Sequence, residues 1–122
     1  MHHTQETPRF SFEGLDVWHL TLEAIELGDA IVRALPRGYG ELADQLKRAS
    51  LSIAANFAEG VGKDAADQRR YFRQARGSAC ETAALIEVAA RLRLTSVERH
   101  GAIRQRLWRI VAILTKLSQK PA

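Results

Sequence analysis

The 122-residue sequence contains few of the residues that cross-link or interrupt a chain. Its single cysteine, Cys80, excludes an internal disulfide and fits a reducing compartment. Its three prolines, Pro8, Pro36 and Pro121, lie outside every periodic segment. No window approaches the roughly eighteen apolar residues that span a bilayer. The first residues also lack a basic region followed by an apolar run. We therefore expect a cytoplasmic protein with no signal peptide and no membrane partner.

The sequence also lacks the patterns of metal and nucleotide sites. A di-metal helical bundle needs two Glu-x-x-His motifs and two further carboxylates, whereas this chain offers only Asp16-x-x-His19. The remaining histidines are His2, His3 and His100. The Gly60–Lys63 segment lacks a glycine and a Ser or Thr that a phosphate-binding loop requires. Cys80 lies among alanines with no histidine nearby in sequence, which predicts a small buried side chain. We expect no metal, no cofactor and no enzymatic activity.

The residues that are abundant, Ala, Leu, Arg and Glu, favour helix. Apolar residues at spacings of three and four predict helices over about 15–35, 41–59 and 65–94. A fourth begins at the capping box Thr95-Ser-Val-Glu98, and Asp64 is a predicted N-cap. Gly60 is predicted to end the second helix in a left-handed conformation. The sequence therefore predicts an all-α, antiparallel up-down-up-down four-helix bundle over residues 14–120, after a flexible arm at 1–13.

The first predicted helix is apolar over an unusually broad surface. One stripe comprises Trp18, Leu22, Ile25, Val32 and Leu35, and a second comprises Val17, Ala24, Leu27, Ile31 and Ala34. The third helix has the stripe Tyr71, Ala75, Ser78, Thr82, Leu85, Ala89 and Leu92, and the fourth has Ile103, Leu107, Ile110, Leu114 and Leu117. Trp108 lies off that last stripe. One bundle core does not need two stripes on one helix, so this excess indicates self-association.

A polar stripe runs beside the apolar stripe of the second predicted helix. It comprises Gln45, Arg48, Ser52, Asn56 and Glu59. Because a short turn joins the second and third helices, antiparallel packing sets Arg48 opposite Ser78 and Gln45 opposite Glu81. We predict a buried Arg48–Glu81 ion pair whose hydrogen bonds Gln45 and Ser78 complete. The alternative is that these groups line a pocket. A role in fixing helix register is favoured because no nucleophile–base arrangement accompanies them.

The charge is unevenly distributed along the chain. Residues 1–62 contain 5 Lys/Arg and 9 Asp/Glu, a net −4, whereas residues 63–122 contain 13 and 5, a net +8. Such asymmetry is typical of an anionic partner, of an oligomer that pairs unlike faces, or of a solvated basic face. The candidate nucleic-acid-binding residues are Arg69, Arg70, Arg73, Arg76, Arg99, Arg106, Arg109 and Lys116, with Lys120 on the same helix as the last four.

Three motifs resemble those of the four-helix-bundle family named for the 23S rRNA intervening-sequence protein. They are Phe12-Glu-Gly-Leu15-Asp-Val-Trp18, Gln45-Leu-Lys-Arg-Ala-x-x-Ser-Ile-x-x-Asn-Phe-Ala-Glu-Gly60, and Phe72-x-x-Ala75-x-Gly77-Ser78-x-x-Glu81. The resemblance covers about residues 10–118. Phe57 stands where the family more often has Ile, and Lys47 where Arg is common.

The resemblance implies a ring-like homo-oligomer, a pentamer. A related bundle, the accessory protein of diversity-generating retroelements, is a basic pentamer that engages reverse transcriptase and nucleic acid. We therefore expect a non-enzymatic protein that binds RNA or DNA through its Arg-rich faces. The alternative is a scaffold ring that docks a protein partner and has no direct role with nucleic acid.

Overall fold

The computed structural model describes residues 8–119, which form four long helices after a short 3-10 turn. The turn η1 spans Ser11–Gly14, and the helices are α1 (Asp16–Ala34), α2 (Gly40–Val61), α3 (Ala65–Arg91) and α4 (Val97–Ser118). No strand occurs within residues 8–119. The all-helical, four-helix prediction is confirmed.

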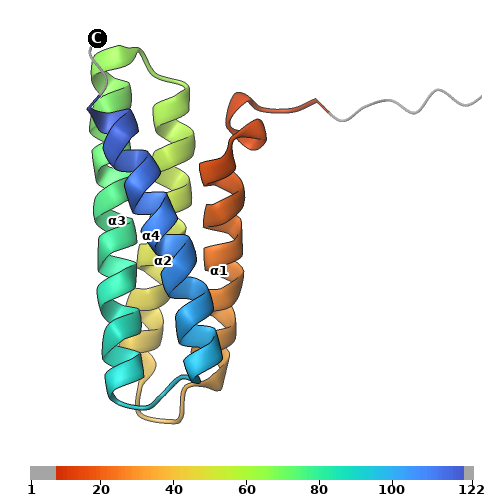
Figure 1. Ribbon diagram of the computed structural model, residues 1–122, viewed down its shortest axis with the longest axis vertical. Coiled ribbons are helices and arrows are strands. Elements are labelled where there is room, and N and C mark those ends of the chain that lie inside the picture. Colours follow the sequence, from red (N-terminus) through yellow and green to blue (C-terminus); the bar gives the residue numbers. More distant parts are fainter. Residues whose placement is uncertain (1–7, 120–122) are drawn as a thin grey trace, which may run out of the picture.

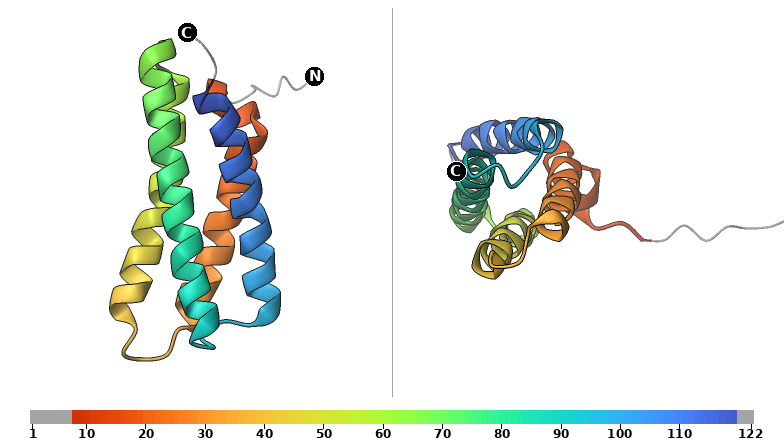
Figure 2. Two further views of the ribbon diagram at one scale, coloured as in Figure 1. Left: turned by 60° about the vertical axis from the view of Figure 1, so that its left-hand side comes forward. Right: turned by 90° about the horizontal axis from the view of Figure 1, so that it is seen from below.

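The four helices pack side by side around one core. The α1–α2 and α3–α4 connections lie at one end of the molecule and the α2–α3 turn lies at the other (Figure 1). Consecutive helices therefore run in opposite directions. Contacts join α2 to α3, α3 to α4, α4 to α1, and α1 to α2. The end-on view shows the helices at the corners of a square (Figure 2). The α1–α2 pair and the α3–α4 pair thus form opposite sides.

The helix ends follow local backbone chemistry. Leu35 is extended (ψ 136°) because the proline that follows disfavours the helical region, so α1 stops at Ala34. At the start of α4 the Ser96 side chain accepts a hydrogen bond from the Arg99 backbone N–H at 3.2 Å. The cap therefore lies one residue later than the predicted capping box. The displaced Thr95 hydroxyl is buried, with no hydrogen-bond partner in the part of the chain described.

Gly60 lies inside α2, and the prediction that it ends the helix in a left-handed conformation is wrong. The one glycine with positive φ within residues 8–119 is Gly38, at 102° in the α1–α2 connection. Gly60 is buried against α3, where an added Cβ would lie 2.9 Å from the Tyr71 Cβ and 3.0 Å from the Phe72 ring. The sequence requires glycine here because two helices approach closely, not because the backbone turns.

The core contains one stripe from each helix. Its buried apolar residues include Val17, Leu20, Ala24 and Ile31 of α1, Leu46, Ile53 and Phe57 of α2, Phe72, Ala79 and Ile86 of α3, and Ile103, Leu107, Ile110 and Leu114 of α4. The predicted α4 stripe is confirmed except at its last member, Leu117, which is half-buried. In the α1 stripe with Val17, Ala24 and Ile31 are also buried, but Leu27 is half-buried and Ala34 is exposed. Leu20 is buried although it belongs to neither predicted stripe, and the stripe with Trp18 borders the core.

The predicted stripe of α3 is partly wrong. Ala75, Thr82 and Ala89 are buried as predicted. Three others, Tyr71, Ser78 and Leu85, are half-buried, and Leu92 is exposed. The prediction missed Phe72, Ala79 and Ile86, which complete the core face one position further along the helix. Alanines occur on several faces of this helix, so their spacing does not identify the buried face.

The segment before α1 packs against it through aromatic rings. The ring centroids of Phe12 and Trp18 lie 4.6 Å apart in an edge arrangement, and Phe10 stacks on Phe12 at 5.7 Å. The predicted flexible arm spans 1–13, of which residues 1–7, including His2 and His3, lie outside the described range. None of the helices within residues 8–119 combines the length and the apolar character that a membrane span requires.

Candidate nucleic-acid interface and neighbouring surfaces

The α3 arginines lie along the first half of that helix. Arg69, Arg73 and Arg76 follow the three-to-four spacing that places side chains on one side of a helix. Arg73 is exposed, whereas Arg69 and Arg76 are half-buried. Arg70 stacks over the Tyr71 ring with its guanidinium carbon 4.6 Å from the centroid. This side of α3 presents planar cations that suit phosphate oxygens and aromatic bases.

Charged side chains surround Tyr71 at the start of α3, and Arg70 contacts one acidic residue of its own helix. Its guanidinium lies 3.6 Å from the Asp67 carboxylate. Lys63 lies 5.9 Å from the Tyr71 ring centroid and 3.1 Å from the Glu59 carboxylate. Its hydrogen bond to Glu59 raises the pKa of Lys63 above the usual 10.5. Glu59 is thus paired with Lys63 rather than placed in the predicted polar network.

The α4 candidates divide between two sides of that helix. Arg99, Arg109 and Lys116 are exposed. Arg106 instead reaches back to α1, where its Nε donates to the Glu23 carboxylate at 3.3 Å. A second Arg106 bond goes to the Ala102 carbonyl at 3.1 Å. The structure therefore leaves Arg106 with a structural role in joining α4 to α1. Lys120 lies outside the described residues.

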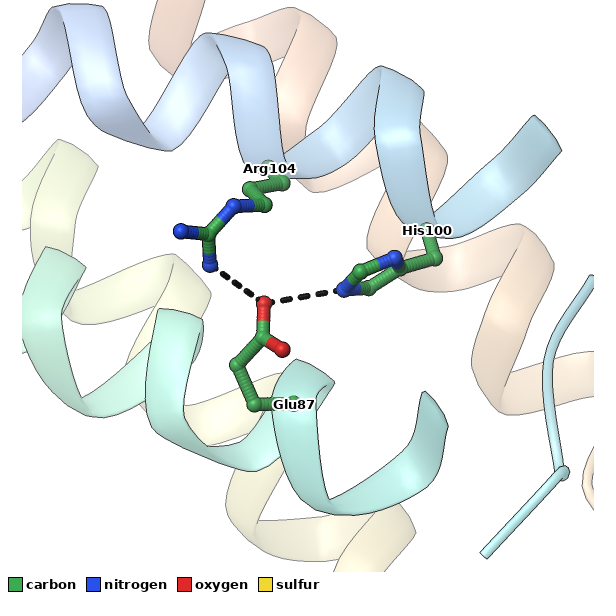
Figure 3. A network of polar contacts seen from close by, with 3 residues as sticks. All are labelled: Glu87, His100 and Arg104. Atoms are coloured by element: carbon green, nitrogen blue, oxygen red, sulfur yellow. Dashed lines mark hydrogen bonds and ion pairs between the residues drawn. The ribbon is translucent and has the colours of Figure 1, made fainter. Parts of the chain in front are cut away.

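A three-residue cluster fixes the register of α3 against α4. Glu87 of α3 lies between two α4 side chains, with its Oε1 2.8 Å from His100 Nε2 and 2.5 Å from Arg104 Nη1 (Figure 3). The His100 hydrogen bond, with Arg104 adding to it, holds the pKa of Glu87 below its usual 4.5. No pattern in the sequence indicates this cluster, because the periodicity within one helix does not relate α3 to α4.

This register determines which candidate cations lie near one another. Counting away from the cluster along antiparallel helices places Lys116 level with about Arg73. These two exposed residues and Arg70 therefore share one end of the α3–α4 side. Arg99 lies at the opposite end, in the first turn of α4. The eight predicted cations thus form an extended field rather than one compact site.

The polar stripe of α2 forms a smaller hydrogen-bonded network than predicted. The hydroxyls of Ser52 and Ser78 are 2.9 Å apart across the α2–α3 contact. Asn56 donates to the Ser52 hydroxyl at 2.9 Å and to the Ser52 carbonyl at 3.0 Å. These three residues connect the two helices at a half-buried position. They support the interpretation that part of the stripe fixes helix register.

The predicted buried Arg48–Glu81 ion pair does not form. Both side chains are exposed, and neither makes an ion pair within residues 8–119. The Gln45 side-chain amide instead donates a hydrogen bond to the Glu41 carboxylate of its own helix, with a donor–acceptor distance of 3.4 Å. A hollow of about 330 Å³ lies between α2 and α3, and its lining residues are Gln45, Arg48, Ala49, Ser52, Ser78 and Glu81. Water solvates both charges there, so an ion pair would add little stability.

Two apolar surfaces lie on opposite sides of the bundle. A groove of about 290 Å³ between α1 and α2 includes Ile25, Val32 and Leu51 in its lining. On α4, Trp108 is 73% exposed.

The side chain of Cys80 is exposed, so the prediction that it is buried is wrong. In the described part of the chain, no group of three or more His, Cys, Asp or Glu is arranged to hold a metal ion.

Comparison with known proteins places this fold in a defined group. A crystal structure of a protein of unknown function from Bacteroides thetaiotaomicron, assigned to the S23 ribosomal protein family, superimposes with a TM-score of 0.76. The match covers 85% of this chain and 99% of that chain at 22% identity, which supports the fold alone. No curated protein gives a significant match. A family model, 23S rRNA-intervening sequence protein, matches residues 13–116. The resemblance predicted from the motifs is confirmed, and the chain belongs to the 23S rRNA-intervening sequence protein family.

Proposed function

We propose that this protein is a non-enzymatic, cytoplasmic, up-down-up-down bundle that assembles into a ring-like homo-oligomer and binds RNA or DNA. The pentameric ring is the assembly that the family resemblance implies. The observation that carries the binding proposal is the field of exposed cations on α3 and α4. Its exposed members are Arg70, Arg73, Arg99, Arg109 and Lys116.

Several features of this field suit phosphate groups. Arg73 and Lys116 make no ion pair within residues 8–119, so their charges are available to a ligand. The half of the chain that supplies the field has a net charge of +8. A homo-oligomer repeats the field in every copy, which multiplies contacts to one long polyanion. Neutralising phosphates releases counterions, so the affinity depends steeply on salt.

A comparison of charge variants tests this proposal. Fluorescence anisotropy with a labelled single-stranded RNA is measured at several salt concentrations for the wild type, Arg73→Gln/Lys116→Gln and a control. The double variant is expected to bind more weakly at low salt and to reduce the slope of log affinity against log salt by about 1–2. Arg37→Gln removes one exposed charge from the α1–α2 connection and should leave the slope unchanged.

The outcome that would overturn the proposal is equally specific. RNA affinity that stays constant between low and physiological salt is incompatible with phosphate contacts. So is an affinity that Arg37→Gln lowers as much as the double variant does, because a general charge effect would then explain the binding. Duplex DNA and duplex RNA measured in the same series identify the preferred nucleic acid.

A second candidate function is a scaffold that docks a protein partner. The observation that favours it is the hollow between α2 and α3, where Arg48 and Glu81 offer opposite charges without pairing with each other. Such a hollow suits the charged side chains of a polypeptide. The salt series also separates the two functions, because a scaffold without a nucleic-acid role gives no specific RNA signal at any salt concentration.

A further inference from the structure

The groove between α1 and α2 is an apolar surface that nothing in the monomer covers. Ile25 and Val32 of α1 and Leu46 and Leu51 of α2 line it, and Leu51 is 57% exposed. Gly28 of α1 also lines the groove. Leaving such a surface in water is unfavourable, so the groove suits a bulky apolar side chain.

Trp108 is the largest exposed apolar side chain of the α3–α4 pair. Arg104, one turn before it, reaches Glu87 of α3, whereas Arg106 reaches Glu23 of α1. Residues four apart share a side of a helix, so Trp108 lies on the α3 side of α4. The groove lies on the α1–α2 pair, which is opposite the α3–α4 pair in the end-on view (Figure 2). Trp108 therefore cannot reach the groove of its own chain.

We infer that Trp108 of one copy docks in the α1–α2 groove of a second copy of this chain. An indole buries about 150–250 Å² of surface when it enters such a pocket. The contact uses different surfaces on its two partners, so one copy of the pair keeps a free groove and the other keeps a free tryptophan. This is the head-to-tail arrangement from which closed rings are built. The inference rests on the self-association part of the proposed function.

Charge complementarity favours a second copy as the occupant. The groove is bordered by Glu26 and Asp29 of α1. Glu26 makes no ion pair within residues 8–119, while Asp29 pairs with Arg33. Trp108 is followed by Arg109, which is exposed and also lacks an ion pair in that range. Docking the indole brings this arginine toward the carboxylates of the other copy.

The net charges of the two halves of the chain also favour a contact between unlike surfaces. The half that contains the groove has a net charge of −4, and the half that contains Trp108 has +8. A symmetric contact between two grooves would bring like charges together, and so would a contact between two α3–α4 faces. Lys47 is the exception, a cation that also lines the groove.

Two variants, each disabled on one side of the contact, test this arrangement. Trp108→Ala removes the docking side chain, and Leu51→Lys places an ammonium group in the groove. Both positions are exposed, so the thermal unfolding of each monomer should be retained. Val97→Ala is the matched control, because Val97 is an exposed apolar residue elsewhere on α4. Masses are measured by sedimentation velocity at equal protein concentrations.

We expect the wild type and Val97→Ala to form the same oligomer, and each disabled variant to sediment as a 13.6 kDa monomer. Mixing the two disabled variants should produce a dimer of twice that mass and nothing larger. Such a mixture contains one intact tryptophan and one intact groove per pair. No contact that uses identical surfaces on both partners predicts this rescue.

Other results overturn the inference. Trp108→Ala that keeps the wild-type mass excludes Trp108 from the contact, and if RNA binding is lost at the same time, the tryptophan contacts nucleic acid instead. Disabled variants that stay monomeric when mixed exclude the head-to-tail pairing. A monomeric wild type instead contradicts the self-association proposal itself, so failure of that proposal is distinguishable from failure of this contact.

Discussion

Individual residues of the family motif have different structural roles although they lie on one helix. Gly60 allows α2 to approach α3, Ser52 and Asn56 connect the two helices, and Arg48 is exposed. A pattern of shared spacing shows which side chains share a side of a helix. It does not show how deeply each is buried, because burial depends on the neighbouring helix.

Gly60→Ala should lower the free energy of unfolding by about 1–3 kcal/mol. The added methyl group overpacks the contact with Tyr71 and Phe72, which outweighs the gain of up to about 1 kcal/mol in helix propensity. Gly77→Ala is the matched control, because an added Cβ there meets nothing within 4 Å. It should raise stability by about 0.5–1 kcal/mol. Urea unfolding of both variants measures the difference, and equal effects would contradict the close approach.

Arg48→Ala should change stability by less than about 0.5 kcal/mol, because the side chain is exposed and lacks an ion pair within residues 8–119. A buried ion pair would have cost about 3–5 kcal/mol on removal of one partner. Ser52→Ala should instead cost about 1–2 kcal/mol, since Asn56 and Ser78 both lose a half-buried partner. Urea unfolding distinguishes these cases, and a larger loss for Arg48→Ala than for Ser52→Ala would refute this assignment.

At the scale of the helices, the amino-acid pattern does not predict which residues of neighbouring helices contact each other. The prediction set Arg48 opposite Ser78, whereas Ser78 bonds to Ser52, one turn further along α2. The turn between α2 and α3 and the close contact at Gly60 set this register. The Glu87 cluster sets the register of α3 against α4. No pattern in the sequence predicts this cluster.

The Glu87 cluster should make stability depend on pH in the acid range. The folded-state pKa of Glu87 lies below its usual 4.5, so the ionised carboxylate stabilises the fold above that pH. This stabilisation decreases as the pH falls from about 4.5 through the lowered pKa. Urea unfolding at about pH 7 and about pH 3 should therefore show a smaller loss for Glu87→Gln than for the wild type.

Other carboxylates also titrate over this range, so a second variant is needed as a control. Asp44→Asn removes an exposed carboxylate that makes no ion pair within residues 8–119. It should retain the wild-type loss of stability on acidification. If Glu87→Gln and Asp44→Asn behave alike, the cluster makes no specific contribution.

At the scale of the whole molecule, the uneven charge and the uncovered apolar groove make self-association the central expectation. A chain of this size buries a limited core, and assembly adds apolar burial that the monomer lacks. The melting temperature should therefore rise with protein concentration, because mass action favours a folded assembly. Differential scanning calorimetry over a hundredfold concentration range measures this effect. Trp108→Ala should melt at one temperature throughout, and a wild type that also does so would argue against assembly.

The sequence by itself determined four helices, most of their bounds, the core faces of α2 and α4, and the family. These features follow from local rules, since apolar spacing, a proline after α1 and a hydroxyl at the start of α4 act within one segment. Only the tertiary structure decided that Gly60 packs against α3, that Cys80 and Arg48 are exposed, and that Glu87 meets His100 and Arg104. These features depend on the rotation and register of one helix against another, and side chains far apart in the sequence set both.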